Sequence, residues 1–178
     1  MIQAIDDAVL FFFGNIQSPF LTTVMKIIVL LTDRGLIWTL LGIALLFFAC
    51  TRRAGITTLT ALIISAILCN FVLKLIFDRA RPFETHDLQL LTAIPYGSSF
   101  PSGHTTTAFA SAVALWLENR KIGLPAIILS VIVAVSRLYF QVHYLTDVLA
   151  GAVSGILFAL LAYYLVDLAC RRWKFPFC

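Results

Sequence analysis

The stretch SRLYFQVHYLTD, residues 136–147, ends one long apolar segment and begins the next. Within it, Arg137, His143 and Asp147 stand beside apolar runs long enough to cross a lipid bilayer. Ionisable side chains at such a depth cost free energy, and proteins keep them there mainly for function. The stretch therefore predicts a turn between two membrane helices, and these three residues are candidates for a functional site.

The composition of the chain predicts an all-α integral membrane protein. Of its 178 residues, 61% are hydrophobic and only 12% are charged, and the mean hydropathy is +0.97. A soluble domain carries about twice that share of charged residues. The net charge of +4 does not indicate nucleic-acid binding, because the basic residues stand in short clusters at the ends of apolar segments. We expect residues 1–178 to form a single membrane-embedded domain.

The apolar segments predict a six-transmembrane-helix bundle preceded by a short N-terminal interfacial helix. Residues 4–14 are too few to cross a bilayer, which takes about 20 residues, so this helix is expected to lie at the membrane surface. The first predicted span is short and contains Lys26, so a re-entrant segment is the alternative to a full crossing there. The expected spans cover residues 19–32, 36–50, 54–77, 102–117, 124–142 and 146–168.

Clusters of basic residues predict the orientation of the bundle. With alternating spans, all of these clusters lie on one face, and the excess of positive charge marks that face as cytoplasmic. The loop 78–101 and His143 then lie on the outer face, and the N-terminus is inside if 19–32 crosses. The clusters are Arg52 with Arg53, Arg120 with Lys121, and Arg171 with Arg172 and Lys174.

Two further groups of polar residues belong to the outer face. Lys74 precedes Arg81 by two helical turns, so a continuous helix places both cations on one side. Taken alone, Lys74 could equally be an anchor that extends to the membrane surface. The segment 101–104, Pro-Ser-Gly-His, indicates a helix start, whose free N–H groups bind anions. Taken alone, Ser102 and Gly103 would be an ordinary helix cap.

His143 and Asp147 are four residues apart, which on a helix places the carboxylate beside the imidazole ring. A carboxylate at one ring nitrogen fixes the tautomer, so that the other nitrogen presents a lone pair. The pair alone is more often structural than catalytic. Together, however, the three groups supply three cations, two histidines and one carboxylate on one membrane face, which favours a phosphoryl group as ligand.

Two histidines at a phosphate site are typical of transfer in two steps. One attacks phosphorus, while the other protonates the leaving oxygen and later activates water. The sequence contains no carboxylate or Cys/His cluster suited to a metal, so we expect no metal and no other cofactor. We also expect no disulfide among the four cysteines, because none of them falls in a loop on the predicted outer face.

Three motifs, Lys74-x6-Arg81-Pro82, Pro101-Ser102-Gly103-His104 and Ser136-Arg137-x5-His143-x3-Asp147, resemble the signatures of the type 2 phosphatidic acid phosphatase superfamily. All three are complete and in order, and they cover residues 74–147. The resemblance implies a six-helix membrane bundle with His143 as the nucleophile, Asp147 as its orienting partner and His104 as the general acid. It implies a phosphate cradle made of Lys74, Arg81, Ser102, Gly103 and Arg137. His86 matches no motif and is expected at the rim.

The resemblance also implies a function. We expect a metal-independent phosphatase of the bacterial inner (plasma) membrane that removes the terminal phosphate of a lipid phosphate or diphosphate at the outer face. Undecaprenyl diphosphate is the favoured substrate, with phosphatidylglycerophosphate close behind. The alternatives are a lipid phosphotransferase or a lipid A phosphatase with the same site, and a non-catalytic lipid-binding membrane protein. The expected partner is the lipid substrate within the bilayer, with no nucleic acid and no obligatory protein partner.

Overall fold

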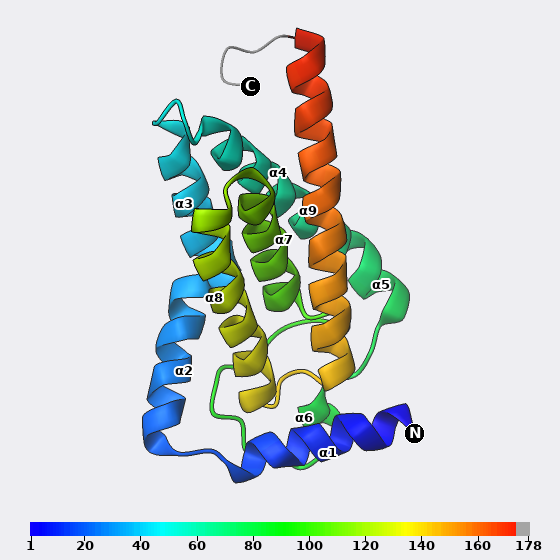
Figure 1. Cartoon of the computed structure of the whole chain (residues 1–178). Helices are drawn as coiled ribbons and strands as arrows, with labels where there is room; N and C mark the ends of the chain where they lie inside the picture. Colours follow the sequence, from blue (N-terminus) through cyan, green and yellow to red (C-terminus); the bar gives the residue numbers. More distant parts are fainter. Residues whose placement is uncertain (174–178) are drawn as a thin grey trace.

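The computed structural model describes residues 1–173, and this part of the chain forms helices and loops without a strand. Figure 1 shows the helices gathered into one bundle. The elements are α1 (Ile2–Asn15), α2 (Pro19–Thr32), the 3-10 turn η1 (Asp33–Gly35), α3 (Leu36–Leu46), α4 (Arg52–Leu68), the π-helical η2 (Cys69–Leu73), α5 (Lys74–Phe77), α6 (Pro82–Thr85), α7 (Gly103–Glu118), α8 (Arg120–Tyr139) and α9 (Leu145–Trp173).

The bundle has the character of a membrane protein. Within residues 1–173, three helical segments are long and apolar enough to cross a bilayer: Arg52–Thr85, Arg120–Tyr139 and Leu145–Arg172. Large apolar side chains such as Phe71 and Leu157 are exposed on the outside of the bundle, as expected for a surface that faces lipid chains. The prediction of an all-α integral membrane protein is confirmed at this level, whereas the count of six spans is not.

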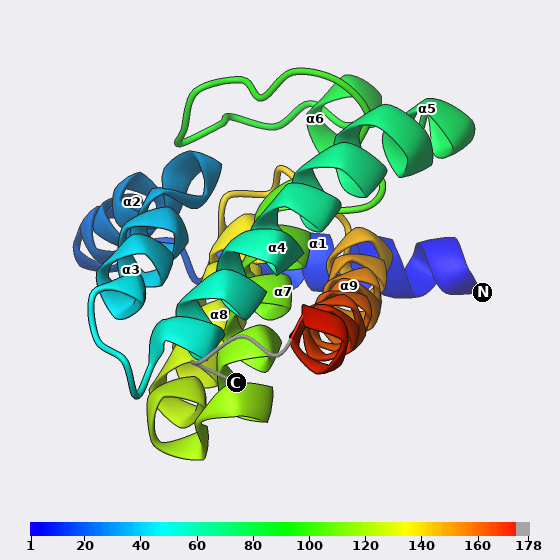
Figure 2. The same cartoon turned by 90° about the horizontal axis from the view of Figure 1, so that it is seen from above.

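The difference lies in α2 and α3, which were predicted as two separate crossings. Figure 1 shows them end to end, and in Figure 2, seen from above, they overlap, so residues 19–46 pass along the bundle once. The backbone N–H of Ser18, at the start of α2, donates a hydrogen bond to the Tyr139 hydroxyl at the end of α8. Gly42 of α3 packs against Gly55 near the start of α4. Each helix alone is shorter than the roughly 20 residues of a full crossing. Residues 33–35 therefore join α2 to α3 without reversing the direction of the chain.

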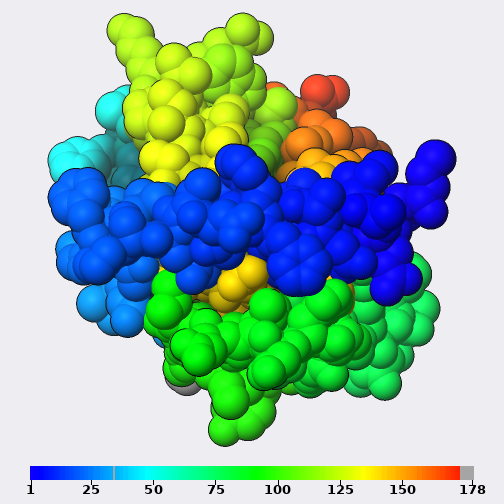
Figure 3. Space-filling model, turned by 90° about the horizontal axis from the view of Figure 1, so that it is seen from below, coloured from blue at the N-terminus to red at the C-terminus, as the bar shows by residue number. Residues whose placement is uncertain are grey.

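Helix α1 lies across the end of the bundle, bent by 115° from α2 (Figures 1 and 3). One side of α1 is buried, with Asp6 and Leu10 against the bundle, while Ile5 and Phe12 are exposed on the other. This amphipathic pattern fits the expected interfacial helix. The N-terminus therefore lies at the same end as α6 and the 140–144 loop, not at the opposite end as the six-span count required.

Helix α7 is the centre of the bundle and packs against α4, α8 and α9. Gly151 and Gly155 let α9 approach α7 closely. A Cβ at Gly155 would lie 2.5 Å from the carbonyl oxygen of Thr106, and one at Gly151 would lie 2.8 Å from that of Ser102. Small residues four apart allow such backbone contact between membrane helices. The contact fixes the start of α9, which carries Asp147, against the start of α7, which carries His104.

The opposite end of the bundle carries the basic clusters. Arg53 forms ion pairs with Glu118 and Asp167, at N–O distances of 3.1 Å each, which tie α4 to α7 and α9 there. Lys174 lies outside the described residues. Cys170, near the end of α9, is disulfide-bonded, which corrects the expectation for the cysteines, whereas Cys50 and Cys69 are free. That expectation considered only the outer loops and overlooked the other end of the bundle.

Candidate active site

The three sequence motifs meet at the end of the bundle where α1 lies. After the bend between α5 and α6, Arg81 contacts the loop between α8 and α9 through the Val142 carbonyl, and Ser102 before α7 bonds to Asp147 just after that loop. Figure 1 shows α6 and this loop at the same end of the bundle. Lys74 begins α5 directly after the π-helical turn η2. Such turns inside a helix are frequent at functional sites because they re-aim the side chains that follow.

His143 is buried in the loop between α8 and α9. Its Nδ1 lies 2.8 Å from the carbonyl oxygen of Ser99, which can only accept, so Nδ1 carries the proton and donates it. The other nitrogen, Nε2, therefore presents its lone pair and lies 3.3 Å from Nη1 of Arg81. There it accepts a hydrogen bond from the Arg81 guanidinium, and an unprotonated Nε2 on a neutral imidazole is the atom that can attack an electrophile.

The environment of His143 keeps the ring neutral. Burial lowers its pKa to about 4, the charges of Arg81 and Arg137 act in the same direction, and the Asp147 carboxylate opposes them. At neutral pH the ring is thus unprotonated, and its Nε2 lone pair is available.

Asp147 holds the loop around His143 and contacts the ring less directly than predicted. Its Oδ2 lies 3.7 Å from Nδ1 of His143, which is too long for a hydrogen bond. The same oxygen accepts hydrogen bonds from the Ser99 hydroxyl at 2.5 Å and from the Tyr144 N–H at 2.9 Å. Asp147 therefore orients His143 through Ser99, whose carbonyl oxygen accepts the hydrogen bond from the ring N–H. Sequence reasoning missed Ser99, because a serine in the run Gly97-Ser98-Ser99 resembles any loop residue.

Arg79 is a second site residue that sequence reasoning missed. Its Nη1 lies 2.6 Å from Oδ1 of Asp147, and its guanidinium stacks over the Tyr144 ring, with Cζ 4.2 Å from the centroid. One carboxylate oxygen of Asp147 thus accepts hydrogen bonds from Ser99 and Tyr144, and the other forms an ion pair with Arg79. The available signal was a third basic residue within the segment 74–81, on a stretch where charges are costly.

Arg81 and Arg137 are buried cations with different partners. The guanidinium of Arg81 donates to the carbonyl oxygens of Gly97 at 2.8 Å and Val142 at 3.0 Å, which fix its position. Arg137 is only 4% exposed, and its Nε and Nη1 have no hydrogen-bond partner among the described residues. A buried guanidinium with unsatisfied donors is unfavourable unless an anion completes the site. Arg137 is therefore a candidate for binding an anionic ligand.

The start of α7 contributes further anion-binding groups. A Cβ at Gly103 would lie 3.5 Å from Nζ of Lys74, so the ammonium group lies directly beside this glycine. Ser102 precedes the helix and makes no side-chain cap, and the first N–H groups of a helix lack intrahelical acceptors. The Ser102 N–H donates to the Asp147 carbonyl at 3.0 Å, which joins this segment to the His143 loop.

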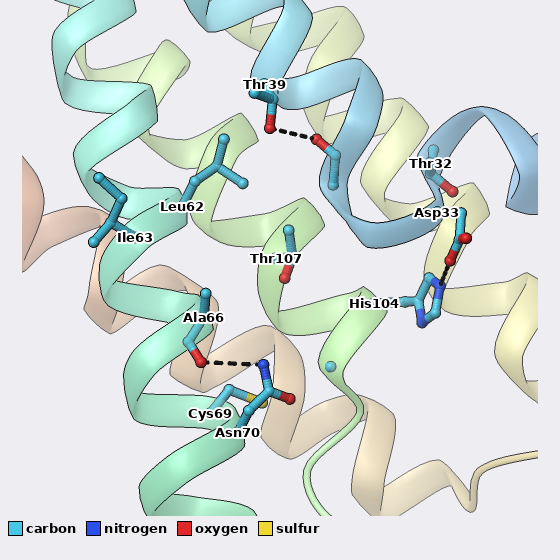
Figure 4. A pocket seen from close by; sticks show the side chains of 12 residues that line it. Thr32, Asp33, Thr39, Leu62, Ile63, Ala66, Cys69, Asn70, His104 and Thr107 are labelled. Atoms are coloured by element: carbon cyan, nitrogen blue, oxygen red, sulfur yellow. Dashed lines mark hydrogen bonds and ion pairs between the residues drawn. The ribbon is translucent and has the colours of Figure 1, made fainter. Parts of the chain in front are cut away.

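His104, in the first turn of α7, lies at the edge of a cavity of about 460 Å³ between α3, α4 and α7. Its Nε2 is 3.4 Å from Oδ1 of Asp33, and Figure 4 shows the two side chains pointing toward one another. Leu62 and Ile63 of α4 line the same cavity, and Cys69 and Asn70 of η2 lie at its lower part. The sequence indicated only a turn at Asp33, so this carboxylate is a third residue that sequence reasoning missed.

If His104 has the role that the sequence motifs imply, we expect Asp33→Asn to lower kcat about tenfold, comparable to the loss of a carboxylate beside a metal-bound histidine. The amide keeps the size of the side chain but no longer stabilises a protonated His104. The measurement is kcat and KM of the purified protein for the hydrolysis of a lipid phosphate, the reaction that the sequence motifs imply. Thr39→Val, which alters another side chain at the same cavity, is the matched control. Equal kcat values for the two variants would show that Asp33 does not assist His104.

His86 and Lys26 lie outside this arrangement. His86 contacts Asp7 of α1, at 3.5 Å between Nε2 and Oδ1, and packs at 5.6 Å between ring centroids against Phe11. It is therefore a contact between α1 and α6. Lys26 is exposed and lines a shallow surface pocket with Leu90 and Leu91. Among the described residues, no group of three or more His, Cys, Asp or Glu side chains could hold a metal ion, and a metal-free reaction stays a prediction.

The chain is similar in sequence to a known family of proteins. A model of the PAP2 superfamily matches residues 54–170. The chain is 33% identical over 150 residues to the undecaprenyl-diphosphatase BcrC of Bacillus subtilis, covering 80% of this chain and 75% of the relative. It is 36% identical over 124 residues to an undecaprenyl-diphosphatase of Sulfolobus acidocaldarius, covering 68% of this chain and 60% of that relative.

Two solved structures share the arrangement of helices. The crystal structure of LpxE from Aquifex aeolicus superposes with a TM-score of 0.78 and 26% sequence identity, over 89% of this chain and 94% of that one. The transmembrane PAP2 type phosphatidylglycerolphosphate phosphatase from Bacillus subtilis gives a TM-score of 0.73 and 28% identity, over 96% of this chain and 87% of that one.

Proposed function

Because the chain belongs to the PAP2 superfamily, and is thus a membrane lipid phosphatase, we propose that it hydrolyses the terminal phosphate of a lipid diphosphate through a phosphohistidine formed on His143. The observation that carries the proposal is the pair of buried, unpartnered nitrogens of Arg137 beside a neutral His143. A phosphoryl group supplies the anion that this guanidinium lacks, and Nε2 of His143 supplies the nucleophile.

In the first step, the lone pair on Nε2 of His143 forms a bond to the terminal phosphorus. The bond from phosphorus to the bridging oxygen breaks, and His104, which the negative charge of the bound phosphate keeps protonated, gives its proton to that oxygen. Lys74, Arg81 and Arg137 stabilise the negative charge on the equatorial oxygens, which is the main requirement in phosphoryl transfer. Because cations and N–H groups fill this role, we propose that the reaction needs no metal ion.

In the second step, water replaces the histidine. His104, now neutral, takes a proton from a water molecule, whose oxygen bonds to phosphorus as the bond to Nε2 breaks. Phosphate leaves, and His143 returns to its neutral form with the proton still on Nδ1. The hydrogen bond from Nδ1 to Ser99 and the nearby Asp147 carboxylate stabilise the positive charge on the ring during both steps.

Undecaprenyl diphosphate is the substrate that we favour, with phosphatidylglycerophosphate second. Two relatives are undecaprenyl-diphosphatases, and they match over more of this chain than the lipid A 1-phosphatases, one of which is 34% identical over 60% of the chain. The cavity between α3, α4 and α7 begins at Gly103 and His104 and is lined further along by apolar side chains such as Leu62. It offers space for the first part of a lipid chain while the diphosphate lies among the cations.

We further propose that the site faces the outer side of a bacterial plasma membrane. The starts of α4 and α8 and the end of α9, which contain the basic clusters Arg52–Arg53, Arg120–Lys121 and Arg171–Arg172, lie at the end of the bundle opposite the loop between α8 and α9 (Figure 1). Since basic loops stay in the cytoplasm, the site is on the periplasmic or extracellular side. The exposed apolar side of α1 would then lie in the outer leaflet.

The test is phosphate release by the purified protein from a polyprenyl diphosphate, phosphatidylglycerophosphate and phosphatidate, compared by kcat/KM. We expect the diphosphate to be preferred by about tenfold or more, since its leaving group is a phosphate and departs more easily than an alkoxide. Vanadate, which imitates five-coordinate phosphorus, should inhibit competitively, and EDTA should leave the rate unchanged. Preference for a monoester would move the assignment to that lipid, and loss of activity in EDTA would contradict the metal-free mechanism.

A further inference from the structure

Asp6, on the N-terminal helix α1, is a fully buried carboxylate that lies outside the region 54–170 matched by the superfamily. Its Oδ1 accepts the backbone N–H of Thr146 at 2.9 Å, and its Oδ2 accepts the Thr146 hydroxyl at 2.6 Å. Thr146 immediately precedes Asp147 in the first turn of α9. A carboxylate that accepts a hydrogen bond from a backbone N–H in the first turn of a helix is stabilised by the helix dipole. Asp6 thus docks α1 onto the segment that orients His143.

Arg79 links Asp6 to the site. Its Nη2 lies 2.8 Å from Oδ2 of Asp6, and its Nη1 lies 2.6 Å from Oδ1 of Asp147. One guanidinium therefore bridges two buried carboxylates, with its planar fork held over the Tyr144 ring. Neither carboxylate can move without changing the other contact of Arg79. Figure 3 shows α1 lying over this face, with the segment around residue 143 visible between α1 and the 78–101 loop.

The charges of this group matter for the reaction. Asp6, Arg79 and Asp147 together carry a net charge of −1. While Nε2 of His143 bonds to phosphorus, the ring becomes positive, and a nearby net negative charge stabilises that state more than the neutral ground state. Without Asp6, Arg79 would cancel the charge of Asp147, and the ring would lose this stabilisation.

We propose that Asp6 is a positioning residue for phosphoryl transfer, acting through Arg79 on Asp147, so that α1 is a part of the catalytic unit. The inference rests on the proposed function, since it assigns a role within that reaction. It differs from simple docking of α1, which Gln141 already supports by donating a hydrogen bond of 2.9 Å from Nε2 to the carbonyl oxygen of Leu10. Docking alone would not require a buried charge that bridges to the partner of the nucleophile.

The test is Asp6→Asn, which keeps the shape of the side chain and an acceptor for the Thr146 N–H but removes the charge. We expect kcat to fall about tenfold, as for other carboxylates that act through a neighbouring group. KM should stay within about twofold, because Asp6 touches none of the groups that hold the phosphate. The amount of phosphohistidine formed in a single turnover should equal that of the wild type, with a slower rate of formation. The matched control is Asp7→Asn, whose carboxylate contacts His86 instead and should keep wild-type kcat.

A double-mutant comparison distinguishes action through Arg79 from a local effect. If Asp6 acts through Arg79, then adding Asp6→Asn to the Arg79→Gln variant should lower kcat by a much smaller factor than adding it to the wild type. Should Asp6→Asn not fold, Arg79→Lys makes the same test, because lysine keeps the charge but cannot bridge both carboxylates. Unchanged kcat in Asp6→Asn, a reduced number of active sites at normal rate, or independent effects in the double variant would each overturn the role. A wild-type protein without activity on any lipid phosphate would instead overturn the proposed function.

Discussion

Replacing His143 with alanine is expected to reduce phosphate release by about four orders of magnitude or more, since no covalent intermediate can then form. The side chain is 3% exposed and keeps its Nε2 lone pair toward Arg81, a position that no other histidine shares among the described residues. The measurement is the steady-state rate with a polyprenyl diphosphate. It is combined with a search for a base-stable phosphorylated protein after brief exposure to substrate labelled in the terminal phosphate.

His86→Ala is the matched control for this variant. His86 lies between α1 and α6 and contacts Asp7 and Thr85, so its loss should leave both kcat and the labelled intermediate close to those of the wild type. Label that persists in His143→Ala would place the covalent bond on another residue. Wild-type turnover without any label in either protein would point to direct attack by water.

Replacing His104 with alanine is expected to separate the two chemical steps. With a diphosphate substrate the leaving group is itself a phosphate, which needs little help from a general acid, so the phosphohistidine still forms. Its hydrolysis requires a base for water and should slow by about a hundredfold or more. The phosphorylated protein should therefore accumulate in His104→Ala, whereas it stays at a low level in the wild type.

With a monoester such as phosphatidate, the same variant should lose the first step as well, because an alkoxide leaves poorly without a proton. Thr107→Val is the control, since Thr107 lies one turn further along α7 and lines the same cavity but cannot transfer a proton in this reaction. If His104→Ala slowed formation and hydrolysis of the intermediate equally for both substrates, its role would be in binding phosphate.

Much of the site could be predicted because its residues are charged or polar within segments that are otherwise apolar. Lys74, Arg137 and Asp147 stand in segments that are otherwise apolar, where a charge without a function is selected against. The helix start at Ser102-Gly103 and the four-residue spacing of His143 and Asp147 are local features, and the structure reproduces both. Asp147 does lie beside the His143 ring, at 3.7 Å between Oδ2 and Nδ1, while the hydrogen bond from Nδ1 goes to the Ser99 carbonyl, which the spacing did not indicate.

The path of the chain before residue 50 was the weakest part of the prediction. A break of three residues between two apolar segments occurs both in a reversal and in a kinked helix, and hydropathy is the same for either. Packing decides between them: Gly35, at φ 76°, lies against Thr107 and Leu62, so the column of α2 and α3 continues along α4 and α7. This placement also brings Asp33 to His104, which no local pattern indicated.

The sequence by itself determined the class of the protein and the residues that cannot be explained by a lipid environment. Only the tertiary structure decided which charge pairs with which. Asp6 and Arg79 are 73 positions apart, and Asp6 and Thr146 are 140 apart, yet they are in contact. The physical reason is that burial energy depends on composition and can be read along the chain. A carboxylate, in contrast, is stabilised by whichever donors lie within about 3 Å, and only the packing of the helices settles which donors those are.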